Sequence, residues 1–317
     1  MHILFVADPL ESFKIYKDST FAMMRSAQAR GHRITVCEPR HIHWISGEKV
    51  SAQVRDIVLT GDEARWFDEA PGRRAELAEF DAIVMRKDPP FDSEYFYATH
   101  LLGQAEREGA KVFNKPAALR DHPEKLAVME FAEYAPVTLV TRSAQDIRDF
   151  HAQHKDIILK PLDGMGGMGI FRVGADGMNL GSIIETLNLD GAQSVMVQKY
   201  LPEITKGDKR VLIIGGEPVP FCLARIPQGN EVRGNLAAGG IGVAQALEPE
   251  DRAIAEHIGA RLAPRGLLLI GLDIIGHRIT EINVTSPTCF QEIEQQAGFP
   301  VGDMFIEALE KAVAEAV

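Results

Sequence analysis

Two adjacent apolar stretches near the C-terminus constrain the fold most, because each carries polar side chains where a buried strand would not need them. The stretch GLLLIGLDIIGHR (266–278) contains Asp273, and the stretch ITEINV (279–284) contains Glu281 and Asn283. Both stretches are typical of β-strands that pair as a hairpin. Successive side chains of a strand point to opposite faces, so Glu281 and Asn283 share one face.

The turn between these strands decides whether the two carboxylates meet. Gly276 and His277 indicate the turn. An odd-length loop centred on His277 places Asp273 opposite Glu281, whereas a two-residue loop places them on opposite faces. Facing carboxylates among apolar residues repel each other unless a cation lies between them. Together with Asn283 they form an all-oxygen ligand set that suits Mg²⁺. We therefore predict an odd-length loop and a metal site; the alternative is a hairpin face exposed to water.

Composition and charge narrow the class of protein. The chain has 317 residues, of which 45% are hydrophobic and 25% are charged, which is typical of a soluble globular protein. Its formal net charge is −11. This charge argues against nucleic acid or an anionic membrane as the main partner. No apolar run approaches the roughly 20 residues of a membrane span, and the start MHILFVADP reads as a strand rather than a signal peptide.

Three widely spaced cysteines, Cys37, Cys222 and Cys289, form no CxxC pattern. An odd number of isolated cysteines predicts reduced thiols and a cytoplasmic protein. Cys289 lies near the predicted metal site, and we interpret it as a small buried residue rather than a nucleophile.

The first third of the chain alternates strands with helices. The strands HILFVAD, RITVCEP, DAIVMRK and KVFNKP enclose two expected helices, 19–30 and 93–108. We expect the serine that begins each helix to be its N-cap and the glycine that follows each helix to end it. This order predicts an α/β N-terminal domain, 1–121, with a parallel doubly wound sheet.

Beyond Asp121 the pattern changes to strands with no regular helix expected between them. These strands are DIILKP, GIFRV, SVMVQKYLP, DKRVLIIGGEPV and the hairpin. We therefore predict a second domain, 122–317, of the α+β class.

The glycine-rich stretch GMGGMG (164–169) matches the dinucleotide-binding pattern GxGxxG by letter. That fold requires a helix after the glycines, and here the strand-like IFRV follows instead. We predict a flexible hairpin loop whose amides close over phosphates while Lys160 neutralises their charge. The alternative is an ordinary glycine-rich turn.

Two further features fit a nucleotide and an anionic substrate. The stretch VMVQKYLP is typical of a segment that pairs adenine with backbone groups, or of any buried strand, and Asp208 after it could accept hydrogen bonds from ribose hydroxyls. Arg210, Arg225 and Arg233 fall within 24 positions of an acidic protein. Each could be an ordinary surface arginine, but together they suit a substrate with several carboxylates.

The order of these features resembles the ATP-grasp family of carboxylate–amine ligases. Lys125 comes first, then Lys160 with the glycine loop, then QKYLP, Asp273 and EIN. Within that family the whole chain resembles the bacterial glutathione synthetases, through MRKDPPFD (85–92), NKPAALRD (114–121), ILKPLDGMGG (158–167), RIPQGNEVRGNLAAGG (225–240) and GLDIIGHRITEINVTSPT (271–288). The resemblance predicts a basic residue after AAGG, where this chain has Ile241, so no contact is carried over from that position.

The resemblance implies ATP-dependent joining of γ-glutamylcysteine to glycine, which yields glutathione, ADP and phosphate through an acyl phosphate. It implies Mg²⁺, with Mn²⁺ as an alternative, and a cytoplasmic homotetramer. It also implies an ATP-grasp domain divided into a lid subdomain, about 122–200, and a catalytic subdomain, 201–317.

The resemblance assigns roles to individual residues. Those implied to bind ATP are Lys125, Lys160, Gly164, Gly166, Gly167, Gln198, Tyr200, Leu201 and Asp208, and the metal ligands are Asp273, Glu281 and Asn283. Those implied to bind the substrates are Lys17, Asp18, Ser19, Arg86, Arg210, Arg225, Arg233, Asn235, Ser286, Pro287 and Thr288. Lys160, Arg210 and Arg225 are the implied catalytic residues, because they offset the charge of the reacting phosphate and carboxylate.

Two other functions are compatible with parts of this pattern. One is a different ATP-grasp ligase, such as a D-alanine–D-alanine ligase or an enzyme that adds glutamate to a protein tail; the long matching stretches argue against it. The other is an ATP-binding regulator that has lost the chemistry. A regulator of that kind would lack some metal ligands or substrate arginines, and this sequence has them.

Overall fold

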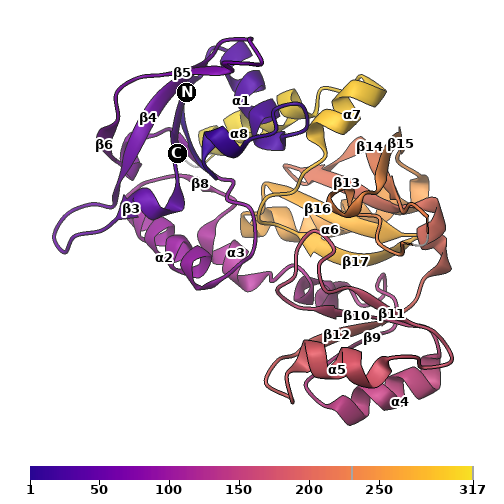
Figure 1. The fold of residues 1–317 in the computed structure, drawn as a ribbon. Coiled ribbons are helices and arrows are strands. Elements are labelled where there is room, and N and C mark those ends of the chain that lie inside the picture. The colour runs from indigo at the N-terminus through magenta and orange to yellow at the C-terminus, as the bar shows by residue number, and fades with distance from the viewer. Residues whose placement is uncertain (230, 316–317) are drawn as a thin grey trace.

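The computed structural model describes residues 1–229 and 231–315, in three β-sheets with their covering helices (Figure 1). One sheet belongs to the N-terminal third, a four-stranded sheet forms the lobe at the bottom of Figure 1, and a five-stranded sheet lies between them. Among the described residues, no helix combines the length and the apolar character needed to cross a membrane.

The N-terminal sheet is parallel at its centre, as predicted. Strand β1 (His2–Val6) lies between β2 (Arg33–Cys37) and β7 (Ala82–Met85), and β8 (Val112–Phe113) continues beside β7, all in parallel. Four strands at the other edge are antiparallel and were not predicted: β3 (Ile42–His43), β4 (Ser51–Leu59), β5 (Phe67–Glu69) and β6 (Arg73–Glu76).

The two predicted N-terminal helices are present, but their N-caps differ from the prediction by one residue. In α1 (Ser19–Ala29) the carboxylate of Asp18 accepts a hydrogen bond from the Phe21 amide, and in α2 (Ser93–Arg107) Asp92 does the same for Tyr95. An aspartate before each serine competes successfully for the cap because its charge also faces the positive end of the helix. A glycine follows each helix end, as predicted.

The lid sheet contains β9 (Thr138–Thr141), β10 (Ile157–Pro161), β11 (Phe171–Val173) and β12 (Val195–Lys199), all antiparallel. The prediction of no regular helix in this region is wrong: α4 (Ala144–His154) and α5 (Leu180–Asn188) cover the sheet, after a short α3 (Pro116–Asp121). Helix α4 is hard to recognise in the sequence because it buries only Ile147 completely and lacks a broad apolar stripe.

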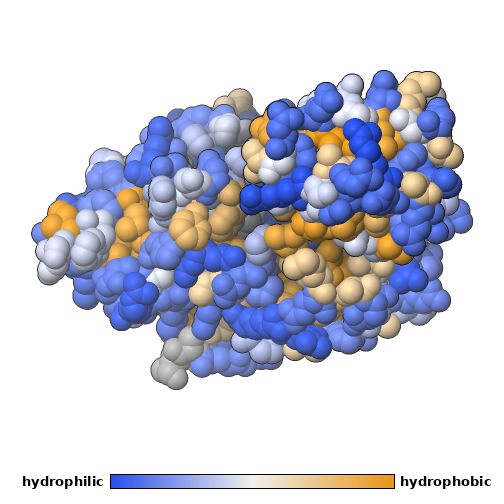
Figure 2. Space-filling view, turned by 90° about the horizontal axis from the view of Figure 1, so that it is seen from below, coloured by the Kyte–Doolittle hydropathy of each residue, from blue (hydrophilic) through white to orange (hydrophobic). Residues whose placement is uncertain are grey.

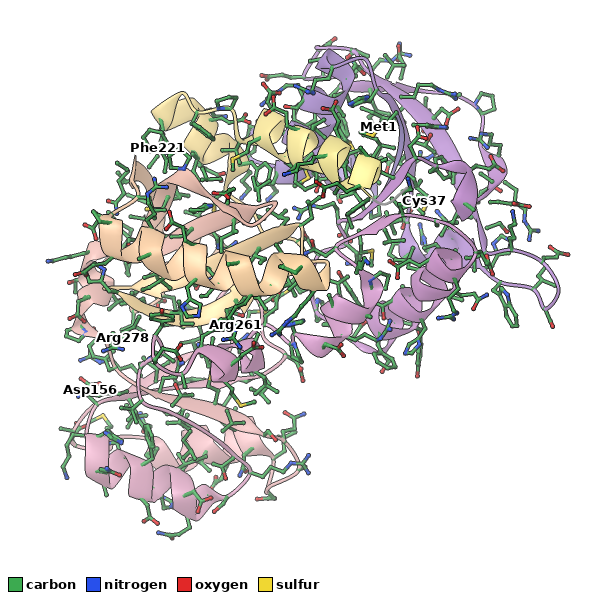
Figure 3. All side chains as sticks on the ribbon, turned by 180° about the vertical axis from the view of Figure 1, so that it is seen from behind. Met1, Cys37, Asp156, Phe221, Arg261 and Arg278 are labelled. Atoms are coloured by element: carbon green, nitrogen blue, oxygen red, sulfur yellow. The ribbon has the colours of Figure 1, made fainter. Side chains whose placement is uncertain are left out.

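The five-stranded sheet is antiparallel, in the order β15 (Ile241–Ala246), β14 (Glu217–Ile226), β13 (Asp208–Ile214), β16 (Leu269–Ile275) and β17 (Arg278–Asn283). Helix α6 (Pro249–Leu262) lies across one face of this sheet, and Arg261 marks it in Figure 3. The chain then returns through α7 (Phe290–Ala297) to α8 (Val301–Glu315), which packs against α1 of the N-terminal domain.

The hairpin β16–β17 brings the two carboxylates together by a different route from the predicted one. Ile275 pairs with Arg278, so the loop has two residues rather than an odd number. That register alone would pair Asp273 with Thr280, but a β-bulge at this point adds one residue to β17. Asp273 therefore pairs with Glu281, as predicted.

Candidate active site

A cavity of about 310 Å³ lies where the five-stranded sheet, the lid sheet and the N-terminal domain meet. The face of the molecule seen in Figure 2 is mostly hydrophilic, with groups of hydrophobic residues between the hydrophilic ones. Most of the predicted site residues line this cavity: Lys125, Lys160, Gly164, Gly166, Gly167, Gln198, Tyr200, Leu201, Asp208, Arg210, Arg225, Arg233, Asn235, Asp273, Glu281, Asn283, Ser286 and Thr288. Lys17, Asp18, Ser19, Arg86 and Pro287 do not line it.

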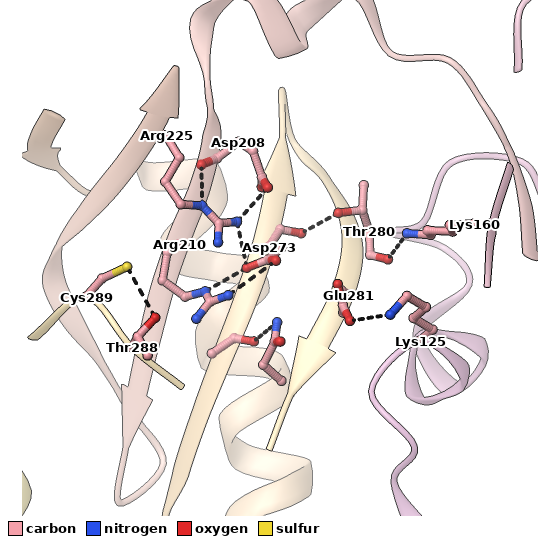
Figure 4. Close-up of polar contacts among 12 residues, drawn as sticks. Lys125, Lys160, Asp208, Arg210, Arg225, Asp273, Thr280, Glu281, Thr288 and Cys289 are labelled. Atoms are coloured by element: carbon pink, nitrogen blue, oxygen red, sulfur yellow. Dashed lines mark hydrogen bonds and ion pairs between the residues drawn. The ribbon is translucent and has the colours of Figure 1, made fainter. Parts of the chain in front are cut away.

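Strand alternation and register place four buried charged residues together on the cavity face. Asp208 pairs with Arg225 across β13 and β14, and Arg210 pairs with Asp273 across β13 and β16. Cross-strand partners share a face, and residues two apart on one strand do so as well. Figure 4 shows the four side chains pointing toward one another.

Two guanidinium groups converge on one carboxylate in this cluster. Asp273 Oδ1 accepts a hydrogen bond from Arg210 Nε at 2.7 Å and forms an ion pair with Arg225 Nη2 at 3.0 Å. Arg225 Nη2 also lies 2.5 Å from Asp208 Oδ2. Burial alone would raise the pKa of Asp273, but the two guanidinium groups hold it well below its usual range.

A glycine makes room for this arrangement. Gly271 lies two residues before Asp273, on the same face of β16. A Cβ atom there would lie 2.9 Å from Pro287 Cβ and 3.2 Å from Arg210 Cδ. Only glycine lets the Arg210 side chain cross the strand toward its partner.

The predicted metal ligands fit a cation that prefers oxygen. Asn283 donates from Nδ2 to the Gly271 carbonyl at 3.3 Å, which leaves its amide oxygen as a ligand atom. Asp273 Oδ2 makes only a long contact of 3.4 Å with Arg210, so it too has capacity for a ligand. With the Glu281 carboxylate, this set offers oxygen atoms only, as Mg²⁺ requires.

A second group of potential ligands lies on the other face of the sheet. Glu248, Asp251 and His277 present atoms within 4.8 Å of one another. The Lys209 ammonium already contacts both Asp251 and Glu248, so a cation of the chain itself neutralises this group.

The predicted phosphate end of the cavity contains two lysines and the glycine loop. Lys125 Nζ donates to the Gly164 carbonyl at 2.6 Å and to Glu281 Oε1 at 3.1 Å, and Lys160 Nζ donates to the Thr280 carbonyl at 3.0 Å. Burial lowers the pKa of Lys160. The loop 164–169 joins the antiparallel strands β10 and β11, which confirms that no helix follows the glycines.

The two glycine-rich segments of the cavity touch each other. Arg233 Nη1 donates to the Gly167 carbonyl at 3.2 Å. A Cβ atom at Gly167, where φ is +85°, would lie 2.7 Å from Asn235 Oδ1. Of the segment 226–242, Asn230 lies outside the described residues.

The residues predicted to frame adenine and ribose also line the cavity. Tyr200 donates its amide to the Asp156 carbonyl at 2.9 Å, and the guanidinium of Arg172 lies 3.7 Å from the centre of its ring. Gln198 donates to Thr138 Oγ1 at 3.2 Å. Asp208 Oδ1 is buried and has no hydrogen-bond partner among the described residues, and burial raises the pKa of this carboxyl to about 6.

The N-terminal residues predicted to bind substrate lie behind the cavity wall. Arg86 is buried and donates to Thr20 Oγ1 at 3.0 Å and to the Pro287 carbonyl at 3.1 Å; its Nη1 has no partner among the described residues. Ser19 Oγ accepts from the Phe290 amide at 3.2 Å, and Asp18 caps α1. These groups contact the segment that follows the hairpin.

Several cavity residues escaped the sequence analysis. Asp88 and Glu124 line the cavity and contact the segment after β17, more than 150 residues away along the chain. Neither belongs to a local pattern that predicts such a contact, although Glu124 precedes Lys125 and Asp88 lies within MRKDPPFD. Cys289 also lines the cavity; burial raises the pKa of its thiol, which supports its interpretation as a packing residue.

Comparison with known proteins confirms the predicted family resemblance along the whole chain. Residues 1–120 match the family described as prokaryotic glutathione synthetase, N-terminal domain, and residues 124–298 match its ATP-grasp domain. The chain is 59% identical to the glutathione synthetase of Ralstonia nicotianae, over 100% of this chain and 97% of that protein. It is 53% identical to the glutathione synthetase of Neisseria meningitidis serogroup B, with 98% of each covered.

Solved structures share the fold at lower identity. The D-cycloserine synthetase DcsG has a TM-score of 0.68 at 14% identity, over 98% of this chain and 99% of that one. The ATP-grasp ligase PsnB, solved with a minimal precursor, Mg and ADP, has a TM-score of 0.63 at 20% identity, over 98% and 97%. These similarities concern the fold and confirm the predicted two-domain architecture.

Proposed function

The chain belongs to the prokaryotic glutathione synthetase family and is an ATP-dependent ligase, and we propose that its cavity joins γ-glutamylcysteine to glycine to form glutathione, ADP and phosphate. The observation that carries this proposal is that one cavity contains two groups of basic side chains, one predicted to bind phosphate and the other predicted to bind a carboxylate. Lys125 and Lys160, with the glycine loop, form the first, and Arg210 and Arg225 form the second.

The chemistry explains why both groups are needed. A carboxylate and an ammonium do not condense at neutral pH, because the carboxylate has no leaving group. Transfer of the γ-phosphoryl group of ATP to the cysteinyl carboxylate gives an acyl phosphate. The glycine amine then attacks the carbonyl carbon, and phosphate leaves with the bonding electrons. The enzyme must therefore bring two anions together before the first step.

The charged residues of the cavity offset this repulsion. Lys125 and Lys160 bind the phosphates of ATP, while Arg210 and Arg225 bind the carboxylate that accepts the phosphoryl group. Arg210 and Arg225 are fixed by their bonds to Asp273, so they meet the substrate without reorganising. Asp208 would accept a hydrogen bond from the ribose of ATP through Oδ1, which has no hydrogen-bond partner among the described residues.

Asp273, Glu281 and Asn283 would hold Mg²⁺, or Mn²⁺ in its place. The ion would supply positive charge that offsets the negative charge of the phosphates during phosphoryl transfer.

The glycine-rich segments protect the intermediate. An acyl phosphate hydrolyses readily, so water must be kept out while glycine binds. The loop 164–169 lies over the phosphate end, and the segment 226–242 meets it through Arg233. We propose that both segments move to admit substrates and close during the reaction.

An assay of ADP release with a panel of acceptors and amines tests the proposal. We expect rapid release only with γ-glutamylcysteine plus glycine, and slow release when either is omitted. Faster release with two molecules of D-alanine, or with glutamate and a peptide, would instead support another ATP-grasp ligase. ATP binding with no release under any condition would support the non-catalytic regulator.

Isotope transfer tests the acyl phosphate. Dipeptide labelled with ¹⁸O in its cysteinyl carboxylate should pass one labelled oxygen to phosphate for each glutathione formed, because that oxygen leaves with the phosphoryl group. Label retained only in the peptide would contradict this intermediate and the roles of both arginines.

The proposal on assembly rests on the family resemblance, and the proposal on location rests also on the three isolated cysteines. We propose a homotetramer in the cytoplasm, which size-exclusion chromatography with light scattering and cell fractionation would test.

A further inference from the structure

Two carboxylates from different parts of the chain hold the segment 284–286, which follows the metal-binding strand and borders the cavity. Glu124 Oε1 accepts three hydrogen bonds, from the amides of Val284 and Thr285, both at 3.0 Å, and from Thr285 Oγ1 at 2.7 Å. On the other side, Asp88 Oδ1 accepts from Ser286 Oγ at 2.5 Å. The segment is therefore fixed at three consecutive residues.

Glu124 also joins this segment to the rest of the active site. Its backbone carbonyl accepts from the Ile282 amide at 3.0 Å, so the linker before the lid runs beside the end of β17. The next residue, Lys125, contacts Glu281 and the Gly164 carbonyl. Glu124 and Lys125 together connect the metal-binding strand, the glycine loop and the segment 284–286.

The chemistry of these contacts requires an oxygen that accepts several hydrogen bonds. Two consecutive amides and one hydroxyl point at a single atom, and a carboxylate oxygen has the lone pairs and the charge to accept all three. Thr285 and Ser286 are buried, so their donors would lack partners if Glu124 and Asp88 were truncated. The shape of the segment then depends on these two side chains.

We propose that Glu124 and Asp88 are positioning residues that fix the segment 284–286 and, through it, the place where the acceptor carboxylate binds beside the metal-binding strand. This inference rests on the proposed function. It predicts a specific kinetic signature: loss of Glu124 should weaken the use of the dipeptide far more than the use of ATP. The contacts of Lys125 with the phosphate end come from its own side chain and remain.

Glu124→Ala and Glu124→Gln separate the positioning role from other roles. With ATP saturating and dipeptide varied, Glu124→Ala should raise the KM for dipeptide about tenfold or more, since three hydrogen bonds to a charged acceptor are lost. The KM for ATP should change less than about threefold. Glu124→Gln should restore most of the lost affinity, because its amide oxygen can accept the same three bonds. Asp88→Ala and Asp88→Asn should repeat this pattern with smaller changes.

Two further variants make the result interpretable. Glu133→Ala, an exposed glutamate of the same linker, is the matched control and should leave both KM values unchanged. Thr285→Val removes one of the three donors at nearly constant volume and should raise the KM for dipeptide about two- to fivefold. If Glu124→Ala does not fold, Thr285→Val alone tests whether these hydrogen bonds affect the KM for dipeptide.

Three outcomes would overturn the inference. The first is an equal rise of both KM values together with a lower melting temperature, which indicates a purely structural role. The second is Glu124→Gln as impaired as Glu124→Ala, which indicates a role for the charge. The third is an unchanged KM for dipeptide in Glu124→Ala or Thr285→Val. Failure of the proposed function would show separately, as absence of wild-type activity with γ-glutamylcysteine; the same variants are then measured with whichever acceptor supports ADP release.

Discussion

Lys209 and Arg210 are neighbours on β13, both are buried, and both pair with a carboxylate, yet their surroundings differ. Lys209 points toward α6 and contacts Asp251, which is fully buried in the first turn of that helix. Arg210 points toward the cavity and shares Asp273 with Arg225. The face of the sheet that α6 covers, the helix face, carries the Lys209–Asp251 pair, with Glu248 and His277 in contact with it. The cavity face carries a cluster in which Asp208 Oδ1 has no partner among the described residues.

The difference shows how buried charge can be assigned to stability or to function. A buried ion pair contributes little net stability, but removal of one partner is strongly destabilising. On the helix face, Lys209 and Asp251 form their ionic contacts with each other, Glu248 and His277, and none of these four residues lines the cavity. On the cavity face, the charged groups retain hydrogen-bonding capacity that only a ligand would use. The two faces should therefore respond to mutation in opposite ways.

The largest effect is expected from a change on the cavity face. Glu281→Ala removes a predicted metal ligand, so turnover should fall about a thousandfold or more because the charge of the γ-phosphate is no longer offset. The melting temperature should fall less than in the helix-face variant Asp251→Leu, because Lys125 keeps its hydrogen bond to the Gly164 carbonyl when Glu281 is removed. Steady-state kinetics at saturating Mg²⁺ and thermal unfolding measure the two quantities. Glu217→Ala, at an exposed position of β14, is the control; near-normal turnover of Glu281→Ala would refute the metal assignment.

The next effect concerns the helix face. Asp251→Leu leaves the Lys209 ammonium buried without its closest partner, so the free energy of unfolding should fall by about 3–5 kcal/mol. The kcat of the folded enzyme should stay within about twofold of wild type, since Lys209 points away from the cavity. Urea unfolding and kinetics at low temperature test both expectations.

A double variant sharpens this second prediction. Lys209→Met with Asp251→Leu replaces both charges by apolar groups and should recover most of the lost stability. No recovery would mean that Asp251 acts through other contacts, such as its 3.0 Å contact with His277.

Features that depend on local periodicity were predicted correctly from the sequence. Features that depend on tertiary contacts were not. The period of two along 279–284 correctly placed Glu281 and Asn283 on one face. The bulge in the hairpin was not visible, so the right pairing was predicted from the wrong loop length. Glu124 and Asp88 hold the segment 284–286 through contacts between residues far apart in the chain. No single sequence pattern predicts such contacts.

The position of a site residue relative to the cavity was likewise predicted correctly only where local periodicity determines it. Residues within strands of the five-stranded sheet line the cavity as expected, because alternation fixes their direction. Arg86 and the segment 17–19 instead lie behind the wall that the chain forms after β17. The domain boundaries remain a prediction, and the experiments above test the roles of individual residues.

The smallest expected effect is a pH dependence of stability at Asp208. Burial raises the pKa of this carboxyl to about 6 from an ordinary value of 3.8. Between these values the folded state binds more protons than the unfolded state, so the free energy of unfolding falls as pH rises through this window. At pH values below 3.8 the Asp208 carboxyl is protonated in both states, so it does not lower the free energy of unfolding. At pH values above about 6 it lowers the free energy of unfolding by on the order of 1–3 kcal/mol.

Asp208→Asn removes this titration while it retains the shape of the side chain. Relative to wild type, the variant should therefore be more stable at pH 7 than at pH 4.5, by on the order of 1–3 kcal/mol. Urea unfolding of both proteins at the two pH values measures the difference. A gap between variant and wild type that does not change with pH would show that Arg225 keeps Asp208 ionised throughout. The cavity face would then resemble the matched pair on the helix face, and the contrast between Lys209 and Arg210 would lose its physical basis.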